Sequence, residues 1–87
     1  MREPIRITPL QDLLLRKVVP IPSVMQATWR SRVQVWRWAK GVSRPRDIAT
    51  TELLIAFYAG RGHALDYNGC YQPSIELTEQ QARGYGL

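Results

Sequence analysis

The sequence predicts a mainly α fold, a compact bundle of about four helices with a small C-terminal β-hairpin extension. Two observations carry this prediction. Serine and threonine residues that can cap helices recur just before segments with helical spacing of apolar residues, and Asn68-Gly69 is a pair typical of two-residue hairpin turns. Eighty-seven residues suffice for one small domain with one modest core. We therefore expect 1–87 to be a single helical domain, with 64–87 as a β and short-helix extension that can serve in dimerisation.

The first predicted helix is bounded by a cap and by prolines. Thr8 is a residue type that caps helix N-termini, and Pro9 suits the first helical position, where an N–H has no intrahelical partner. Leucines at helical spacing follow, so the helix is expected to continue to about Val18. Pro20 and Pro22 then end the pattern.

The second predicted helix is short and begins at a serine. Ser23 and Gln26 have the spacing of a capping box, which predicts a helix over 24–28. Only Trp29 and Arg30 separate this segment from the next capping serine. Because such a tight turn between two helices is typical of helix-turn-helix geometry, the bundle is predicted to be a helix-turn-helix bundle.

The third predicted helix, over 32–40, has both ends marked in the sequence. Ser31 and Gln34 repeat the capping spacing, and Gly41 is the residue expected just past a helix C-terminus. One side of this helix is apolar and is predicted to face the core: Val35, Trp38 and Ala39, with Val42 one turn further on. The other side carries Arg32, Val33, Trp36 and Arg37.

A fourth helix is expected from about Asp47 to Ala59, with Gly60 as its stop. Its second half is apolar on almost every side, whereas a surface helix keeps one polar face. Two interpretations are open at this stage. The helix is either sandwiched in the core or used in part against another subunit.

The remaining segment combines a turn signal with a cap. Asn68-Gly69 lies between two short segments of strand character, which predicts a hairpin with Tyr67 and Tyr71 near its tip. Thr78 and Gln81 form a last capping box, which predicts a short terminal helix.

Three tryptophans lie within ten residues and are given different roles. Trp38 is on the apolar stripe and is predicted to be core, and Trp29 in the turn is predicted to be a lid on that core. Trp36 lies away from the stripe and has two interpretations. It either packs on sugar or thymine methyl groups in a DNA groove, or it is covered by the N-terminal segment, for example by Ile5 and Ile7.

Positive charge is concentrated in one segment. Residues 13–46 contain eight basic residues and no acidic residue, which is a local charge of +8, although the whole chain is only +5. Residues 47–87 have two basic and five acidic residues, a net charge of −3. Lysine and arginine gain free energy by displacing counterions from phosphates, so a segregated basic segment suits a polyanion.

Several functional classes are disfavoured by the composition. His63 is the only histidine and Cys70 the only cysteine, so we expect neither enzyme activity, a metal site nor a cofactor, and we interpret Glu76 and Glu79 as surface charge. A small-molecule substrate is not expected. The N-terminus lacks the apolar run of a signal peptide or a membrane span, so the expected location is the cytoplasm.

The run from Ser31 to Gly41, followed by Arg44-Pro45 and the apolar helix through Leu53-Leu54, resembles the Cro and lambda-repressor-like helix-turn-helix class, which includes small phage regulators and some antitoxins. The resemblance covers roughly residues 10–60. It implies that Val35 and Trp38 of the third helix are core and that the N-terminal part of this helix enters the major groove. Carried over by position, the residues that face base edges or the adjacent backbone are Ser31, Arg32, Val33, Trp36 and Arg37.

The expected function is therefore a sequence-specific DNA-binding regulator, acting as a homodimer on double-stranded DNA and repressing by occupying a promoter. The residues expected on the DNA backbone are Ser23, Arg30, Gln34, Lys40, Arg44 and Arg46. The alternative is a small phage-encoded interaction protein that presents the same basic face to a host protein or to RNA. An antitoxin or an excisionase would share the DNA-contacting helix.

Overall fold

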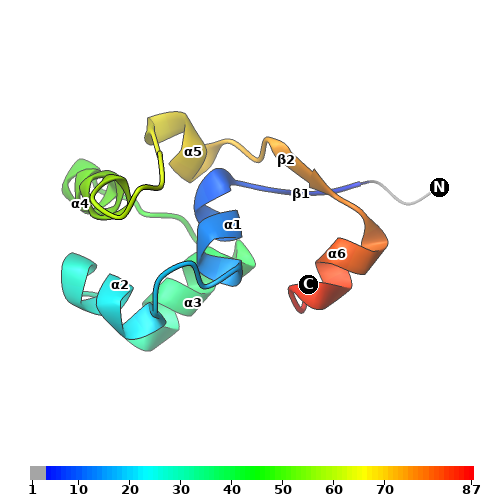
Figure 1. Ribbon diagram of the computed structural model, residues 1–87, viewed down its shortest axis with the longest axis horizontal. Helices are drawn as coiled ribbons and strands as arrows, with labels where there is room; N and C mark the ends of the chain where they lie inside the picture. The colour runs from blue at the N-terminus through cyan, green and yellow to red at the C-terminus, as the bar shows by residue number, and fades with distance from the viewer. Residues whose placement is uncertain (1–3) are drawn as a thin grey trace.

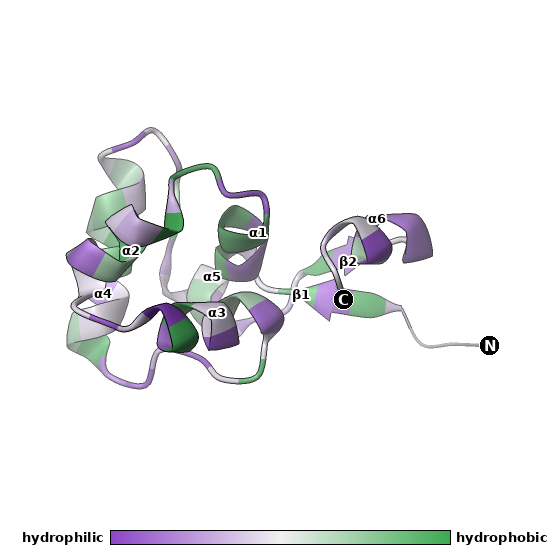
Figure 2. Cartoon of the chain, turned by 90° about the horizontal axis from the view of Figure 1, so that it is seen from below, coloured by the Kyte–Doolittle hydropathy of each residue, from purple (hydrophilic) through white to green (hydrophobic). Residues whose placement is uncertain are grey.

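The computed structural model describes residues 4–87 and shows a mainly helical chain with one small antiparallel sheet (Figure 1). In chain order the elements are β1 (Ile5–Ile7), α1 (Pro9–Leu15), α2 (Ile21–Thr28), α3 (Arg32–Lys40), α4 (Ile48–Ala59), α5 (Tyr67–Tyr71), β2 (Ile75–Leu77) and α6 (Glu79–Gly84). Helices α1 to α5 form a helical body. The β1–β2 sheet and α6, called here the terminal wing, project from one side of that body (Figures 1 and 2). The predicted fold class is confirmed.

Helix α1 begins at the predicted cap but ends earlier than predicted. The Thr8 hydroxyl accepts a hydrogen bond from the Gln11 N–H at 3.1 Å, and the Gln11 side chain accepts one from the Thr8 N–H at 3.0 Å. The helix stops at Leu15 rather than near Val18. Lys17 adopts a left-handed conformation with φ of 53°, which reverses the chain before the prolines are reached.

Helix α2 starts at Ile21, so the predicted start at the Ser23 cap is wrong. Its N-cap is Pro20, and no side chain caps it. The Ser23 N–H already donates to the Pro20 carbonyl at 3.0 Å and therefore lies inside the helix. The proline-rich start is tolerated because the first N–H groups of a helix need no intrahelical acceptor, and Pro22 occupies one of these positions.

Helix α3 has the predicted bounds. The Ser31 hydroxyl accepts a hydrogen bond from the Gln34 N–H at 3.2 Å, and Gly41 follows the helix with φ of 76°. A side chain at Gly41 would be strained by this backbone conformation. The second half of the capping box differs from the prediction, because the Gln34 side chain donates to the Ser43 hydroxyl at 3.4 Å.

Helix α4 also has the predicted bounds, and its capping residue Asp47 accepts a hydrogen bond from the Thr50 N–H at 3.0 Å. Only one side of α4 is buried: Thr50, Thr51, Leu54 and Tyr58. On the other side Ile48 is 68% exposed and Leu53 43% exposed. The interpretation that α4 is sandwiched in the core is therefore wrong, and an apolar face of this helix lies open.

The predicted hairpin at Asn68-Gly69 is wrong, because these residues lie inside helix α5. Asp66 caps this helix and accepts a hydrogen bond from the Gly69 N–H at 2.6 Å. A Cβ atom at Gly69 would lie 3.0 Å from the Leu65 side chain and 3.4 Å from that of Pro9, so glycine lets α5 pack closely against the start of α1. The antiparallel pair is formed instead by β1 and β2, with Ile7 opposite Ile75.

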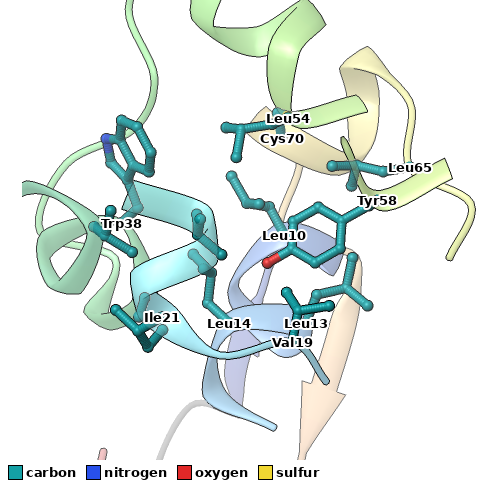
Figure 3. Packing of buried hydrophobic residues seen from close by; sticks show 13 residues of the cluster. Leu10, Leu13, Leu14, Val19, Ile21, Trp38, Leu54, Tyr58, Leu65 and Cys70 are labelled. Carbon is teal, nitrogen blue, oxygen red and sulfur yellow. The ribbon is translucent and has the colours of Figure 1, made fainter. Parts of the chain in front are cut away.

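Two clusters of buried side chains hold the fold together. The larger cluster fills the helical body and includes Leu10, Leu14, Val35, Trp38, Leu54 and Tyr58 (Figure 3). The smaller one lies in the terminal wing and is formed by Ile7, Leu77 and Ala82. Cys70 belongs to the larger cluster, where burial raises the pKa of its thiol to about 11.

The terminal wing ends in α6, as the capping box predicts. The Thr78 hydroxyl accepts a hydrogen bond from the Gln81 N–H at 3.1 Å, and the Gln81 side chain accepts one from the Thr78 N–H at 2.9 Å. The helix ends at Gly84. The Tyr85 hydroxyl then donates to an Asp12 carboxylate oxygen at 3.0 Å, which ties the wing back to α1.

Candidate nucleic-acid interface

Helix α3 is held from the inside by the helices that precede it. Helices α1 and α2 both pack against it, and only residues 29–31 connect α2 to α3. Val35, Trp38 and Ala39 are buried, as predicted. Val42 is 76% exposed, so its predicted place on the core stripe is wrong. The chain turns at the left-handed Gly41, which takes Val42 off the helical path.

The outer side of α3 gathers most of the residues predicted to contact bases. Arg32, Val33 and Arg37 are exposed, and Trp36 is half-buried beside them. These four residues, called here the reading face, line a shallow hollow of about 310 Å³ together with Lys40 and Val42. Figure 2 looks onto this side of the molecule. The fifth predicted residue, Ser31, is exposed and caps the helix.

Trp36 combines a packed side with an accessible one. It packs against the larger cluster, and the ammonium groups of Lys17 and Lys40 lie 5.7 Å and 6.0 Å from its ring centroid. Ile5 and Ile7, which the sequence suggests as a cover for Trp36, do not cover it. Ile5 is exposed and Ile7 is buried in the terminal wing. The indole is thus anchored by the helical body while part of it lines the hollow on α3.

Trp29 is 90% exposed, so the prediction that it covers the core is wrong. It ends α2 with φ of 59°, in the left-handed region that non-glycine residues seldom adopt. Its N–H and that of Arg30 both donate to the Met25 carbonyl, which closes the end of α2. The resulting turn places the indole in solvent just before the first turn of α3.

Replacing Trp29 with glycine is expected to raise the free energy of unfolding by about 1 kcal/mol, because glycine adopts positive φ without the steric cost of a Cβ atom. Trp29→Ala is the matched control, since it removes the same indole but keeps the Cβ. Urea titrations of both variants measure the difference. A glycine variant less stable than the alanine variant would contradict the account of backbone strain in this turn.

Two of the residues predicted to contact the DNA backbone already have partners within the chain. Arg30 forms an ion pair with Asp47 at 3.2 Å and donates to the Thr50 hydroxyl at 3.0 Å. Hydrogen bonds from Thr50, together with the Arg30 charge, lower the pKa of the Asp47 carboxyl. Lys40 donates to the Tyr85 and Gly86 carbonyls at 3.3 Å and 3.2 Å, so its ammonium is held against the terminal wing.

The other predicted backbone contacts differ in accessibility. Arg44 and Arg46 are exposed in the loop that follows α3, and within residues 4–87 neither has a carboxylate partner in an ion pair. Gln34 is half-buried and bonded to Ser43, and Ser23 is half-buried inside α2. The loop thus presents two unpaired guanidinium groups next to α3.

A second hollow, of about 360 Å³, lies between α3 and this loop, and we call it the arginine hollow. It is lined by Arg30, Gln34, Arg37, Trp38, Ser43, Arg44, Pro45, Arg46 and Asp47. Four of its members are not among the predicted site residues: Trp38, Ser43, Pro45 and Asp47. Trp38 is predicted only as core, and Ser43 could not be inferred from local spacing because the bond that brings it to Gln34 spans nine residues.

The two tyrosines predicted at a hairpin tip instead tie α4 to the region of α5. The Tyr67 hydroxyl donates to a Glu52 carboxylate oxygen at 2.7 Å, and this bond raises the pKa of the Tyr67 phenol. The Tyr71 and Thr51 hydroxyls share a hydrogen bond of 2.6 Å. These contacts fix α5 against α4 within the helical body.

Other kinds of site are not seen in the part of the chain that the structure describes. Residues 4–87 contain no group of three or more histidine, cysteine, aspartate or glutamate side chains placed to hold a metal ion. Their helices are all too short or too polar to cross a lipid bilayer. No protein-family model, curated protein or solved structure matches this chain.

Proposed function

We propose that the chain is a sequence-specific DNA-binding transcriptional regulator that places α3 in the major groove of double-stranded DNA. The observation that carries this proposal is the division of α3 into two sides. Its inner side is buried against α1 and α2, and its outer side offers Arg32, Val33 and Arg37 to solvent. A helix held rigidly in this way can present side chains without losing its own orientation.

The chemistry of the reading face suits base edges. An α-helix fits the major groove, and arginine can donate two hydrogen bonds to the O6 and N7 atoms of guanine. Arg32 and Arg37 lie on the exposed side of the same nine-residue helix. Val33, which is 60% exposed, and Trp36 supply apolar surface for contact with thymine methyl groups.

The charge distribution supports the same orientation on DNA. Arg44 and Arg46 flank α3 in the following loop, where they can neutralise phosphates without reading sequence. Apart from Asp47, which is paired with Arg30, the acidic residues of 47–87 lie outside the arginine hollow. The loop and α3 therefore form one continuous basic surface.

Selection of bound sequences from a pool of random duplexes tests the proposal, and arginine variants then assign the roles. We expect Arg32→Ala and Arg37→Ala to reduce the ratio of specific to random DNA affinity, by about 1–3 kcal/mol for each lost contact to a base. Arg44→Ala, the matched control, should weaken both affinities alike because it contacts phosphate.

If no sequence is enriched and the protein binds RNA or an acidic protein more tightly than any duplex, the regulator hypothesis is wrong. The basic surface then belongs to the alternative function, an interaction protein. Equal losses of affinity for specific and random DNA at all three arginines would mean that α3 lies on the backbone rather than in the groove.

The proposed regulator acts as a homodimer, with α4 supplying the contact. The open side of α4 carries Ile48, Ala49, Leu53 and Ala56, and its single charged residue, Glu52, is bonded to a tyrosine of the same chain. Symmetric pairing of such faces is the commonest form of oligomer, and it can present two recognition helices about one helical turn of DNA apart.

Leu53→Glu is expected to abolish dimerisation and cooperative binding to a two-fold operator while leaving the fold intact, because Leu53 is 43% exposed. Deletion of 64–87 is a poorer test, since it removes Leu65 and Cys70 from the core. Light scattering measures the oligomeric state, and Arg61→Glu beyond the end of α4 is the control. A wild-type chain that stays monomeric at high concentration would refute the dimer.

A further inference from the structure

The residues that line the arginine hollow carry far more positive than negative charge. Four arginines, Arg30, Arg37, Arg44 and Arg46, line it against a single carboxylate. That carboxylate belongs to Asp47 and is already engaged by Arg30 and Thr50. The hollow therefore has a surplus of positive charge and of N–H donors.

One of the residues that line this hollow also carries a buried donor without an acceptor. Trp38 is only 3% exposed, and among the described residues its indole N–H has no hydrogen-bond partner. An indole N–H can only donate, and leaving such a group buried and unpaired is costly. In Figure 3 the indole nitrogen lies on the edge of the ring that is turned away from Leu10 and Leu14.

We propose that the arginine hollow is an oxyanion site that seats one phosphate group, with the Trp38 indole N–H donating to a phosphate oxygen and the guanidinium groups around it balancing the charge. Given the proposed function, on which this site rests, the phosphate belongs to the DNA backbone. Hydrogen bonds to charged acceptors are stronger than those between neutral groups, so a phosphate is a suitable acceptor for the unpaired donor.

Binding of a phosphate requires a small rearrangement of the side chains that line the arginine hollow. The indole nitrogen is sealed from solvent, and Gln34 and Ser43, which both line the hollow, are joined by a hydrogen bond of 3.4 Å. That bond is at the long end of the range and is readily exchanged for bonds to a phosphate. Both side chains are themselves donors to an oxyanion.

The position of the site fits a phosphate that borders the groove. Arg37 lines both the arginine hollow and the shallow hollow of the reading face. A phosphate seated in the arginine hollow therefore lies directly beside bases that α3 would contact. Such a contact fixes the register of the helix on DNA without reading sequence itself.

Indole N–H resonances of ¹⁵N-labelled wild-type protein test the site directly, after assignment with Trp29→Phe, Trp36→Phe and Trp38→Phe. We expect the Trp38 indole proton to move downfield when a selected duplex binds, and to move in the same direction at much higher concentrations of inorganic phosphate. Chloride at matched ionic strength is the control and should leave this resonance in place.

The outcomes separate the two proposals. If the duplex binds and the Trp38 resonance does not move, the phosphate seat is wrong and the proposed function stands. If no duplex binds but phosphate moves the resonance, the oxyanion site stands and the proposed function fails. If neither the duplex nor inorganic phosphate moves the Trp38 resonance, the oxyanion site is refuted.

A cycle that combines protein variants with modified DNA phosphates identifies the contact between Trp38 and the phosphate. Trp38→Phe removes the indole N–H and keeps an aromatic ring, and we expect it to weaken specific and random duplex binding alike by roughly tenfold, as for loss of a hydrogen bond to a charged group. Tyr58→Phe is the matched control, because the Tyr58 hydroxyl is also buried without a partner but lies outside the hollow. It should leave DNA affinity unchanged.

Neutral methylphosphonates placed one at a time along the selected duplex complete the cycle. At one position per half-site the Trp38→Phe penalty should disappear, because the phosphate partner is already lost. A penalty that is the same at every position would overturn the seat. Melting temperatures of both phenylalanine variants are measured alongside, so that loss of fold is not mistaken for loss of contact.

Discussion

Trp38→Ala is expected to unfold the domain or to lower its free energy of unfolding by about 3–5 kcal/mol, the range found when a large buried aromatic is removed. Trp38 is almost fully buried and packs in the cluster with Val35 and Ala39. Since domains of this kind have total stabilities of roughly 5–15 kcal/mol, one such loss takes a large share.

Thermal and urea unfolding followed by circular dichroism measure this effect. Trp29→Ala is the control, because its indole is 90% exposed and little packing is lost with it. A Trp38→Ala variant that melts with the wild type would show that the core does not depend on this indole.

Binding to duplex DNA is expected to weaken steeply with salt. If the charges of Arg32 and Arg37 in the groove and of Arg44 and Arg46 on the backbone each displace one counterion, the slope of log affinity against log salt is roughly −3.6 per protomer, from about −0.9 per charge. A fourfold rise in salt then lowers affinity by roughly 150-fold. Release of Arg30 or Lys40 from its partner within the chain would make the slope steeper.

Fluorescence anisotropy of a labelled duplex across a salt series gives the slope. Arg46→Ala should reduce its magnitude by about one. Arg61→Ala is the matched control, because Arg61 lies 4.1 Å above the Phe57 ring, outside both hollows beside α3. A slope near zero for the wild type would remove the basis for any nucleic-acid function.

Helix ends were predictable where the signal is local. The caps at Thr8, Ser31 and Thr78 bond N–H groups three residues away, and Gly41 supplies the positive φ that ends α3, so a short window of sequence contains each interaction. The Asn68-Gly69 signal failed because it competes with two others. Asp66 caps α5 through the Gly69 N–H, which is a local interaction, and Gly69 packs against Pro9 of α1, a contact that no turn preference of two residues reports.

The spacing of residues along α3 predicts which of its sides faces solvent. It does not predict which side chains of the candidate site are bonded to other parts of the chain. The 3.6-residue period separates Val35 and Trp38 from Arg32 and Arg37, and the structure keeps that separation. The partners of Lys40 are more than forty residues away in sequence and could not be inferred from spacing. Exposure of Trp29 depends on a left-handed backbone that sequence patterns for tryptophan do not indicate.

The pairing of β1 with β2 has a kinetic consequence. Ile5 meets Leu77, so this ladder joins segments from opposite ends of the chain, whereas the contacts between α2 and α3 join neighbours. Closing so long a loop costs more conformational entropy than closing a short one. A ladder of three paired residues on each strand contributes little stability by itself to offset that cost. We therefore expect the helical body to nucleate folding and the terminal wing to be added to it afterwards.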